Sequence, residues 1–342
     1  MIDLVSDTVT RPSPAMLDAM LAAPLGDDVL CEDPSVNALE EKTADMFGME
    51  AGLFCASGTM TNQIALNVHT RPGDSVICHE LAHIYLYEGG GMMANSGLSV
   101  RLVGSHDGLM TDTEVDDAID TSTNVHNAIT RVVALENTSN RGGGRCYDME
   151  TIRSIGAVTK QQGLAYHLDG ARVFNALVAR DQNPSDYGNE FDSISVCFSK
   201  SLGCPIGSVL LGSRELIFEA RRLRKRLGGG WRQAGMLAAA AVYALDQNIE
   251  RLHEDHARAR ELYNCIRELD WVHRVTDPET NIVLMETATE KAAAQIQYQL
   301  AERGLRIQHM GKNRLRAVTH LDVSDADIDR ACALLRSLEV KL

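Results

Sequence analysis

The chain has 342 residues and no long apolar run. No segment comes near the ~18 consecutive apolar residues that a membrane-spanning helix requires. The amino-terminal sequence MIDLVSDTVTRP also lacks the apolar core of a signal peptide. A hydrophobic content of 44% and a charged content of 23% are typical of a soluble globular protein. We therefore expect a cytoplasmic protein that does not act at a membrane.

Cysteine pairs and metal-ligand clusters are also absent from the sequence. The eight cysteines are widely spread, with no C-x-x-C pair. This pattern is typical of reduced, mostly buried thiols in a reducing compartment. His253 and His256 are three residues apart but lie in a charged helical segment, so we expect no bound metal.

Basic residues are in the minority. The chain has 33 lysines and arginines against 47 aspartates and glutamates, which gives a net charge of -14 and a pI of about 5.2. This surplus of acidic residues argues against nucleic acid or an anionic membrane surface as a partner. It is compatible with a small anionic ligand, because the local field of a site can be positive.

The order of apolar and helical segments predicts an α/β fold. Short apolar runs alternate with helical segments, which indicates a mostly parallel sheet with helices on both faces. The expected strands lie at residues 51–55, 75–78, 100–103, 131–135 and 165–169, and in the run that begins at residue 191. The expected helices of this part lie at residues 14–20, 36–47, 60–69 and 149–162.

A second, smaller domain is expected at the C-terminus. Residues 236–269 form a long alanine-rich helical segment, and we place the domain boundary within it, near Asp246. The segments beyond it predict strand, helix, strand and helix, at residues 281–285, 292–303, 315–319 and 325–337. The expected parts are an N-terminal arm too polar to be core (1–14), a large domain (15–246) and a small α/β domain (247–342).

Lys200 follows an apolar run and precedes a loop rich in glycine and proline. Ligands of α/β sheets bind at strand ends, and a partly desolvated lysine amine has a lowered pKa that makes it a nucleophile. A lysine that only marks where the strand meets water would have the same sequence. Asp169 ends another predicted strand and favours the functional interpretation. Pyridoxal phosphate (PLP) needs a lysine for its Schiff base and an aspartate for its pyridine nitrogen.

Three further motifs suit the same cofactor, although each has a simpler explanation. Ser57-Gly58-Thr59 lies between a predicted strand and helix. Such a turn binds phosphate with free backbone N–H groups, or it is an ordinary helix cap. His83 lies just past a strand end and stacks on a planar ring or is a structural histidine. Residues 221–226 hold five cations before a triple glycine, which suits a phosphate or a solvated helix face.

Together these segments closely resemble the low-specificity L-threonine aldolases, which are PLP enzymes. The resemblance covers nearly the whole chain and implies the PLP-dependent transferase fold type I. This fold has a large domain, whose mostly parallel sheet is covered by helices, and a small C-terminal α/β domain. The matching segments are IDLVSDTVTRP, GDDV…EDPSVNALE, SGTMTN, AHIYLYE, LEN, HLDGARVFNA, SKSLGCPIGS, RRLRKRLGGGWRQAG and LRAVTHLDV.

The resemblance implies a role in cofactor binding for several residues. Lys200 would carry the Schiff base, Asp169 would pair with the pyridine nitrogen, and His83 would stack on the ring. The phosphate and the rest of the cofactor would be bound by Ser57, Gly58, Thr59 and Arg172, and by Lys225 and Arg232 of a neighbouring subunit. A site shared in this way requires at least a dimer, and the family is usually tetrameric.

The resemblance also implies how an amino-acid substrate would bind. Ser6, Arg172 and Arg316 would hold its α-carboxylate, a task that suits the planar fork of a guanidinium group. His126 falls at the position of a second family histidine, near the β-hydroxyl. The base that removes the hydroxyl proton would be His83, His126 or a water that they hold.

The expected reaction is the cleavage of threonine or allo-threonine to glycine and acetaldehyde. An aminotransferase or a β-eliminating lyase would instead use Lys200 to remove the α-proton. A dinucleotide-binding protein is disfavoured because no G-x-G-x-x-G follows the first strand, and an interaction module would leave the lysine, aspartate and arginines without a purpose. The positions that depart from the family pattern bear on side-chain preference and threo/erythro selectivity: Leu30, Cys31, Ser139, Ser201 and Cys204.

Overall fold

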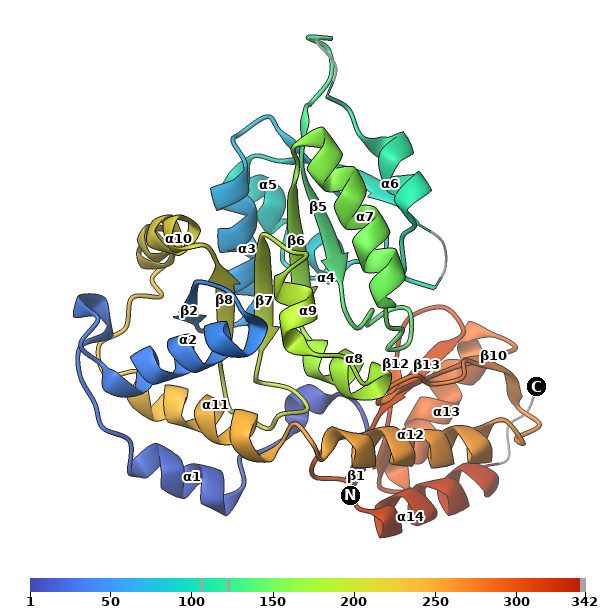
Figure 1. Cartoon of the computed structure of the whole chain (residues 1–342). Helices are drawn as coiled ribbons and strands as arrows, with labels where there is room; N and C mark the ends of the chain where they lie inside the picture. The colour runs from blue at the N-terminus through green and yellow to red at the C-terminus, as the bar shows by residue number, and fades with distance from the viewer. Residues whose placement is uncertain (105–106, 122–123, 339–342) are drawn as a thin grey trace.

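The computed structural model describes residues 1–104, 107–121 and 124–338, and two sheets organise them (Figure 1). The larger sheet has seven strands in the order β2-β8-β7-β6-β5-β3-β4, and the smaller has four in the order β12-β13-β10-β9. The strands of the larger sheet are β2 (Ala51–Cys55), β3 (Ser75–His79), β4 (Ser99–Val103), β5 (Thr130–Glu136), β6 (Ala165–Gly170), β7 (Ser193–Cys197) and β8 (Ser208–Gly212).

The larger sheet confirms the mostly parallel arrangement. Strands β4, β3, β5, β6 and β7 pair in parallel, whereas β8 runs antiparallel to both of its neighbours, β2 and β7. Strand β8 was not among the expected strands. Every residue of β3, β7 and β8 is buried, as in sheets that are covered on both faces.

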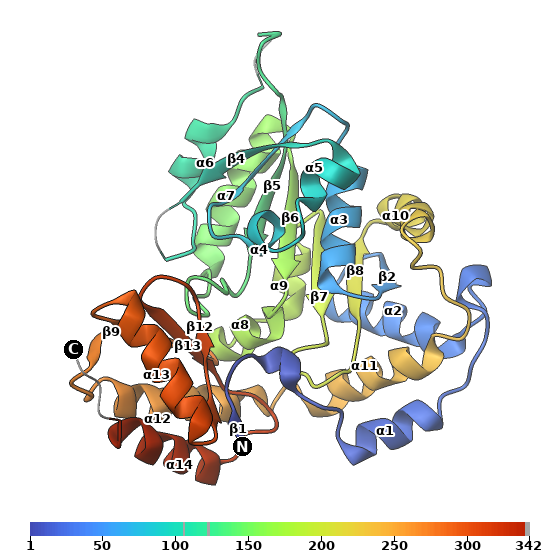
Figure 2. The same cartoon turned by 180° about the vertical axis from the view of Figure 1, so that it is seen from behind.

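Helices cover both faces of the larger sheet (Figures 1 and 2). None of the helices among the described residues is long and apolar enough to span a membrane. One face carries α2 (Pro34–Phe47), α7 (Met149–Gln162), α8 (Val173–Arg180) and α9 (Pro184–Gly188), and the other carries α3 (Gly58–His69), α4 (His83–Leu86), α5 (Gly91–Ser96) and α10 (Arg214–Arg226). Further helices are α1 (Pro14–Leu21), α6 (Asp112–Ala118) and α11 (Gly235–Gln247).

Local capping residues set the helix ends that the sequence predicted. Helix α7 begins after Asp148, whose side chain accepts a hydrogen bond from the Thr151 backbone N–H, and ends at Gly163 with φ 66°. Helix α1 begins after Ser13 in the same way. These are the usual start and stop signals of helices.

The smaller sheet has its own apolar core and confirms the small C-terminal domain. Its antiparallel strands are β9 (Val272–Val275), β10 (Ile282–Thr287), β12 (Gln308–His309) and β13 (Arg314–Val318), and its helices are α12 (Leu252–Ile266), α13 (Glu290–Glu302) and α14 (Asp325–Arg336). The long helical segment expected at residues 236–269 is divided into two helices, α11 and α12. At the break, Asn248 donates a side-chain hydrogen bond to the Leu202 carbonyl.

The N-terminal arm is part of the core, so the expectation that it is too polar to be core is wrong. Strand β1 (Ile2–Asp3) pairs in parallel with β11 (Leu305–Arg306). Ile2 and Leu4 pack in the core of the small domain. Asp7 is 0% exposed and forms an ion pair with Arg172, which removes the cost of burying an isolated charge.

Candidate active site

The site lies where parallel strands of the larger sheet end. Glu136 is the last residue of β5, Asp169 is the next to last of β6, and Lys200 follows β7 by three residues. Glu136 and Asp169 are direct neighbours in the register of β5 and β6. The carboxyl ends of parallel strands are the usual ligand-binding edge of such sheets.

Lys200 lies in the turn between β7 and β8. Its Nζ donates a hydrogen bond to Cys197 Sγ at 3.4 Å. Burial would raise the pKa of the Cys197 thiol, but the charge of Lys200 holds it below its usual range. The amine therefore points back toward the end of its own strand and not into bulk water.

Asp169 is buried, and only one of its two carboxylate oxygens has a hydrogen-bond partner. Its Oδ1 accepts a hydrogen bond from the Ala171 backbone N–H at 3.2 Å, whereas its Oδ2 is buried without a hydrogen-bond partner. Burial raises the pKa of this carboxyl, and Glu88 adds to the effect, while His83, Lys200 and the nearby Asn62 side chain oppose it. A buried acceptor without a donor costs folding free energy. A ligand that donates a hydrogen bond to this oxygen would remove that cost.

His83 opens α4 and is held from two sides. Its backbone N–H donates to Glu136 Oε2 at 2.9 Å, and its Nδ1 lies 3.1 Å from Glu88 Oε1. Burial would lower the pKa of His83, but the hydrogen bond to Glu88 and the charges around it raise it. One side-chain atom each of His83, Glu88 and Asp169 lies within 4.8 Å of the others. The imidazole is thus fixed beside the aspartate that would meet a pyridine nitrogen.

Glu136 adds a further carboxyl to this group. Burial, and then the neighbouring Asp169, raise its pKa to about 7. It accepts hydrogen bonds from the backbone N–H groups of His83 and Asn140. It therefore links the short helix α4 to the loop after β5.

The Ser57-Gly58-Thr59 turn lies against the lysine turn. Ser57 is the cap of α3, and its Oγ accepts a hydrogen bond from the Met60 backbone N–H at 3.2 Å. A Cβ at Gly58 would lie 4.0 Å from the Cβ and Sγ of Cys197. The turn is both a helix cap and the start of a helix beside the lysine, where free N–H groups suit a phosphate.

Arg172 forms a bidentate ion pair with Asp7. Its Nε and Nη2 donate to the two carboxylate oxygens, each at 2.7 Å. Burial would raise the pKa of Asp7, but the charge of Arg172 holds it well below its usual range. The remaining nitrogen, Nη1, donates to Asn140 Oδ1 at 3.4 Å, so only one edge of this guanidinium faces the site.

Arg316 belongs to β13 of the small domain. Its Nη1 donates a hydrogen bond to the same Asn140 oxygen at 2.7 Å. Its Nη2 donates to Gln308 and to the Val5 carbonyl, and its Nε is buried without a partner. Burial, and then Arg172, lower the pKa of Arg316 to about 10. Two guanidinium groups therefore donate to one neutral acceptor, the Asn140 side-chain oxygen. A substrate carboxylate in its place would bring a full negative charge to both of them. Ser6 lies beside them, with its Oγ 3.5 Å from Asp7 Oδ1.

Three predicted site residues lie elsewhere in this protomer. Arg232 forms an ion pair with Asp27 at 2.8 Å, and Lys225 lines a cavity of about 480 Å³ beside α10. His126 is exposed in the connection between α6 and β5, which extends beyond the amino end of the sheet in Figure 1. Within the described ranges, none of the three has a hydrogen bond to the residues around Lys200.

Sequence reasoning missed the supporting groups Asp7, Glu88, Glu136 and Asn140. Glu88 and Glu136 belong to the matching segments AHIYLYE and LEN but had no predicted role, and Asp7 belongs to an arm that was expected to lie outside the core. Their partners are far away in the sequence, as in the 165-residue separation of Asp7 and Arg172. Composition and periodicity carry no signal for such pairs.

Two departures from the family pattern have a structural explanation. Ser201 is buried and its Oγ donates to Asp7 Oδ2 at 2.8 Å, while Asn281 donates to Ser201 at 3.2 Å. Ser201 therefore ties the lysine turn to the arm and to the small domain. Ser139 Oγ accepts a hydrogen bond from the Gly142 backbone N–H, and it lies so close to Gly108 that a Cβ at Gly108 would come within 2.0 Å of it.

The fold is that of the PLP-dependent enzymes of fold type I. A threonine aldolase structure from Leishmania major superposes with a TM-score of 0.84 at 21% identity, covering 98% of this chain and 99% of that chain. A structure described as SPT with PLP internal aldimine superposes with a TM-score of 0.73 at 19% identity, covering 98% and 86%. The unpartnered Asp169 Oδ2 beside Lys200 fits the pyridine nitrogen of this cofactor.

The chain belongs to the β-eliminating lyase family, whose profile matches residues 3–290. The low-specificity L-threonine aldolase of Escherichia coli K12 is 41% identical over 98% of this chain and 99% of its own length. A probable low-specificity L-threonine aldolase of Arabidopsis thaliana is 39% identical over 96% and 94%. The family and the site agree on a lyase with pyridoxal phosphate as cofactor.

Proposed function

We propose that this protein cleaves L-threonine, L-allo-threonine and related β-hydroxy-α-amino acids. The products are glycine and acetaldehyde or the matching aldehyde, and the reverse reaction adds glycine to aldehydes. One observation carries the proposal. Lys200 and Asp169 lie at the ends of neighbouring strands, and Oδ2 of Asp169 is buried without a hydrogen-bond partner. The threonine aldolases at 39–41% identity support the choice of substrate.

Pyridoxal phosphate supplies, when bound, the electron sink that allows the Cα–Cβ bond to break. Lys200 would attach it, Asp169 Oδ2 would accept a hydrogen bond from its ring nitrogen, and His83 would cover the ring. Gly58 and Thr59 at the start of α3 would hold the phosphate, with Ser57 beside them. The described contacts that support these roles are the Lys200–Cys197 hydrogen bond and the proximity of Gly58 to Cys197.

Arg172, Arg316 and Ser6 bind the α-carboxylate of the substrate. The carboxylate displaces Asn140 from Arg316 Nη1 and Arg172 Nη1, which both donate to its side-chain oxygen. Holding the carboxylate decides which bond to Cα is aligned for cleavage, and such positioning is a large part of catalysis. Arg172 itself is held by Asp7.

The base for the β-hydroxyl proton is His83, His126 of a neighbouring protomer, or a water that they hold. Glu88 occupies the Nδ1 side of His83, which leaves Nε2 as the nitrogen for the substrate proton. A base must reach the proton that it removes within hydrogen-bond distance. We assign His126 to a neighbouring copy of the chain, because it is exposed in the connection between α6 and β5.

The active form is a cytoplasmic homotetramer that shares its sites between protomers. Lys225 and Arg232 of one copy reach the phosphate in another copy, and at least a dimer is required. Mixing two inactive variants, Lys200→Ala and Arg232→Ala, tests this. Random exchange restores about one quarter of the sites, because each mixed pair has one intact site. Recovery of no activity, with mixed assemblies present by native mass spectrometry, contradicts sharing.

We propose the domain division that the sequence predicted, with an arm at 1–14, a large domain at 15–246 and a small domain at 247–342. The break between α11 and α12 and the separate apolar core of the small sheet support it. Limited proteolysis of the holoenzyme should cut first near residues 248–251. A first cut within either sheet would contradict this boundary.

Lys200→Ala tests the central claim. The purified variant should lack the visible absorbance of the bound Schiff base and should release no acetaldehyde from L-threonine. The control, Lys160→Ala, removes an exposed lysine of α7 and should be yellow and active. A Lys200→Ala protein that is still yellow would overturn the site, and wild-type protein that forms keto acids but no acetaldehyde would overturn the reaction.

A further inference from the structure

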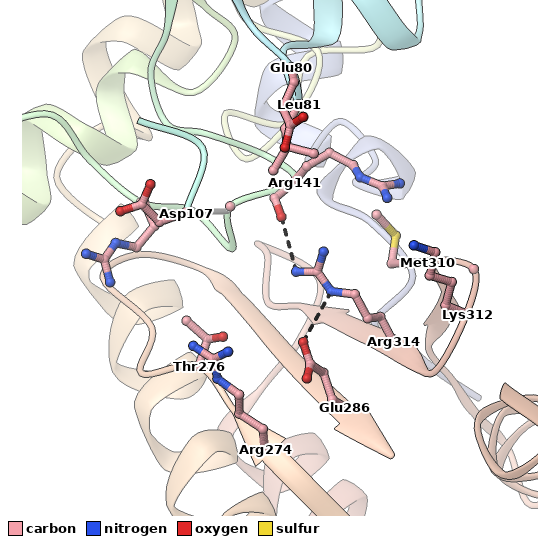
Figure 3. A pocket seen from close by; sticks show the side chains of 13 residues that line it. Glu80, Leu81, Asp107, Arg141, Arg274, Thr276, Glu286, Met310, Lys312 and Arg314 are labelled. Carbon is pink, nitrogen blue, oxygen red and sulfur yellow. Dashed lines mark hydrogen bonds and ion pairs between the residues drawn. The ribbon is translucent and has the colours of Figure 1, made fainter. Parts of the chain in front are cut away.

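A second cavity lies beside the site, between the large domain and the small domain. It encloses about 890 Å³. One wall comes from residues 80, 81, 107, 141, 142 and 145, and the opposite wall from residues 274, 276, 286, 310–312 and 314 (Figure 3). A ligand in this cavity would contact both domains.

The lining of this cavity is cationic in a protein that is strongly acidic overall. Five cations face three carboxylates, which leaves a formal charge of +2 where the whole chain has -14. Such a local field attracts anions. The cations are Arg141, Arg145, Arg274, Lys312 and Arg314, and the carboxylates are Glu80, Asp107 and Glu286.

Arg314 lies in the middle of this group (Figure 3). Its Nη2 donates to the Arg141 carbonyl at 3.4 Å, and its Nε lies 3.8 Å from Glu286 Oε1, beyond hydrogen-bond range. The Nε atoms of Arg314 and Arg141 are both buried without a hydrogen-bond partner. Burial, and then Arg141 and Arg274, lower the pKa of Arg314, although Glu286 opposes them. An oxyanion would accept hydrogen bonds from these Nε atoms and would balance the positive charge of the two arginines.

The cavity is connected to the catalytic groups by direct contacts. Arg141 Nη1 donates to Tyr87 Oη at 2.5 Å, and the Tyr87 ring lies 5.7 Å from the His83 ring. Arg314 and Arg316 are two residues apart on β13, so their side chains leave the same face of the sheet. Tyr87 therefore contacts both His83 and Arg141, and Arg141 lines the cavity.

We propose that this cavity binds an oxyanion, a carboxylate or a phosphate group, across the two domains. One source of the anion is the side chain of a β-hydroxy-α-amino acid that ends in a carboxylate, and this source rests on the proposed function. The Cα–Cβ bond breaks, the β-hydroxyl loses its proton to become the aldehyde carbonyl, Cα gains a proton, and the carboxylate leaves with the aldehyde. The other source is a free polycarboxylate or phosphate.

The first arm of the test compares β-hydroxyglutamate with β-hydroxyglutamine, which have the same shape and differ in charge. The ratio of their kcat/KM values should favour the acid in the wild type. Arg274→Gln and Lys312→Gln should each reduce the ratio about tenfold, the effect of one lost charge-assisted hydrogen bond. The control, Arg330→Gln, removes an exposed arginine of α14 and should leave the ratio as it is.

The second arm measures citrate binding to the glycine-bound holoenzyme by titration calorimetry, so that the catalytic anion sites are already filled. Arg274→Gln should weaken citrate binding about tenfold, and Arg330→Gln should not. A response in the first arm identifies a substrate-borne anion, and a response in the second identifies a free one. Threonine cleavage without a response in either arm overturns the cavity proposal alone. Citrate binding that needs Arg274, in a protein that cleaves no hydroxyamino acid, overturns the proposed reaction alone.

Discussion

Replacing Asp7 by asparagine removes one partner of the buried ion pair with Arg172. Asp7 accepts hydrogen bonds from Arg172 Nε and Nη2 at 2.7 Å each, from Ser201 at 2.8 Å and from Asn281 at 3.3 Å. These donors come from the large domain, the lysine turn and the small domain. The carboxylate therefore joins three parts of the molecule at one point, beside the turn that holds Lys200.

The expected cost of Asp7→Asn is about 3 kcal/mol of unfolding free energy. Removing one partner of a buried pair typically costs about 3–5 kcal/mol, because the remaining charge stays buried without compensation. Asparagine retains one acceptor oxygen, so we expect the lower end of that range. Urea unfolding followed by circular dichroism, at pH 7 and at one protein concentration, measures it.

The matched control is Asp246→Asn, since Asp246 forms an exposed pair with Lys42 at 2.5 Å. Exposed pairs contribute about 0–1 kcal/mol, so this variant should unfold near the wild-type midpoint. If both variants lose the same stability, or if Asp7→Asn is within about 0.5 kcal/mol of the wild type, the argument for a critical buried pair is refuted.

The same pair predicts a pH dependence with a definite sign. The pKa of Asp7 is lowered in the folded protein, so the unfolded chain binds the proton more readily. Its contribution to stability is complete above the unfolded pKa of about 3.9. It is lost progressively as the pH falls below that value toward the folded pKa. The stability gap between wild type and Asp7→Asn should therefore narrow in acid, and a gap that widens would contradict the assignment.

Three further predictions concern the site itself. Asp169→Asn should bind the cofactor but lower kcat for threonine about 10²–10³-fold, the loss expected for one well-placed electrostatic group, and unchanged turnover would contradict its role. His83→Asn and His126→Asn, assayed for acetaldehyde release, should separate the candidate bases, since loss of a general base costs at least ~10²-fold. If neither variant reaches that loss, a water or another group is the base. Ser201→Gly should cost about 1 kcal/mol in urea unfolding, because it removes hydrogen bonds but no charge, and a loss of cofactor absorbance would show that Ser201 does more than support the turn.

Much of the fold could be predicted because its signals are local. Apolar runs predicted the strands from β2 to β7, and helical segments predicted helices such as α1 and α7. Strand β8 was missed although it is as buried as its neighbours. Its antiparallel place between β2 and β7 depends on pairing with segments that are distant in the sequence. The break between α11 and α12 was missed because both segments have helical periodicity, and the contact of Asn248 with Leu202 is tertiary.

The sequence by itself determined the chemical groups of the site. Lys200 after a buried strand, Asp169 at the end of another and a Ser-Gly-Thr turn before a helix are each contained in a short segment. The chemistry of PLP needs these groups, so short segments and the resemblance to the threonine aldolases were enough to predict a PLP site. The roles of the individual side chains stay predictions.

Only the tertiary structure decided which side chains contact these groups and which charges surround them. The register of β5 and β6 places Glu136 beside Asp169, and the folding of the arm into the core places Asp7 on Arg172. The packing of the small domain against the large one brings Arg316 to Asn140 and encloses the cationic cavity. Hydrophobic periodicity specifies which face of an element is buried. The ion pairs and cavities form between elements far apart in the chain, so they depend on strand register and domain packing.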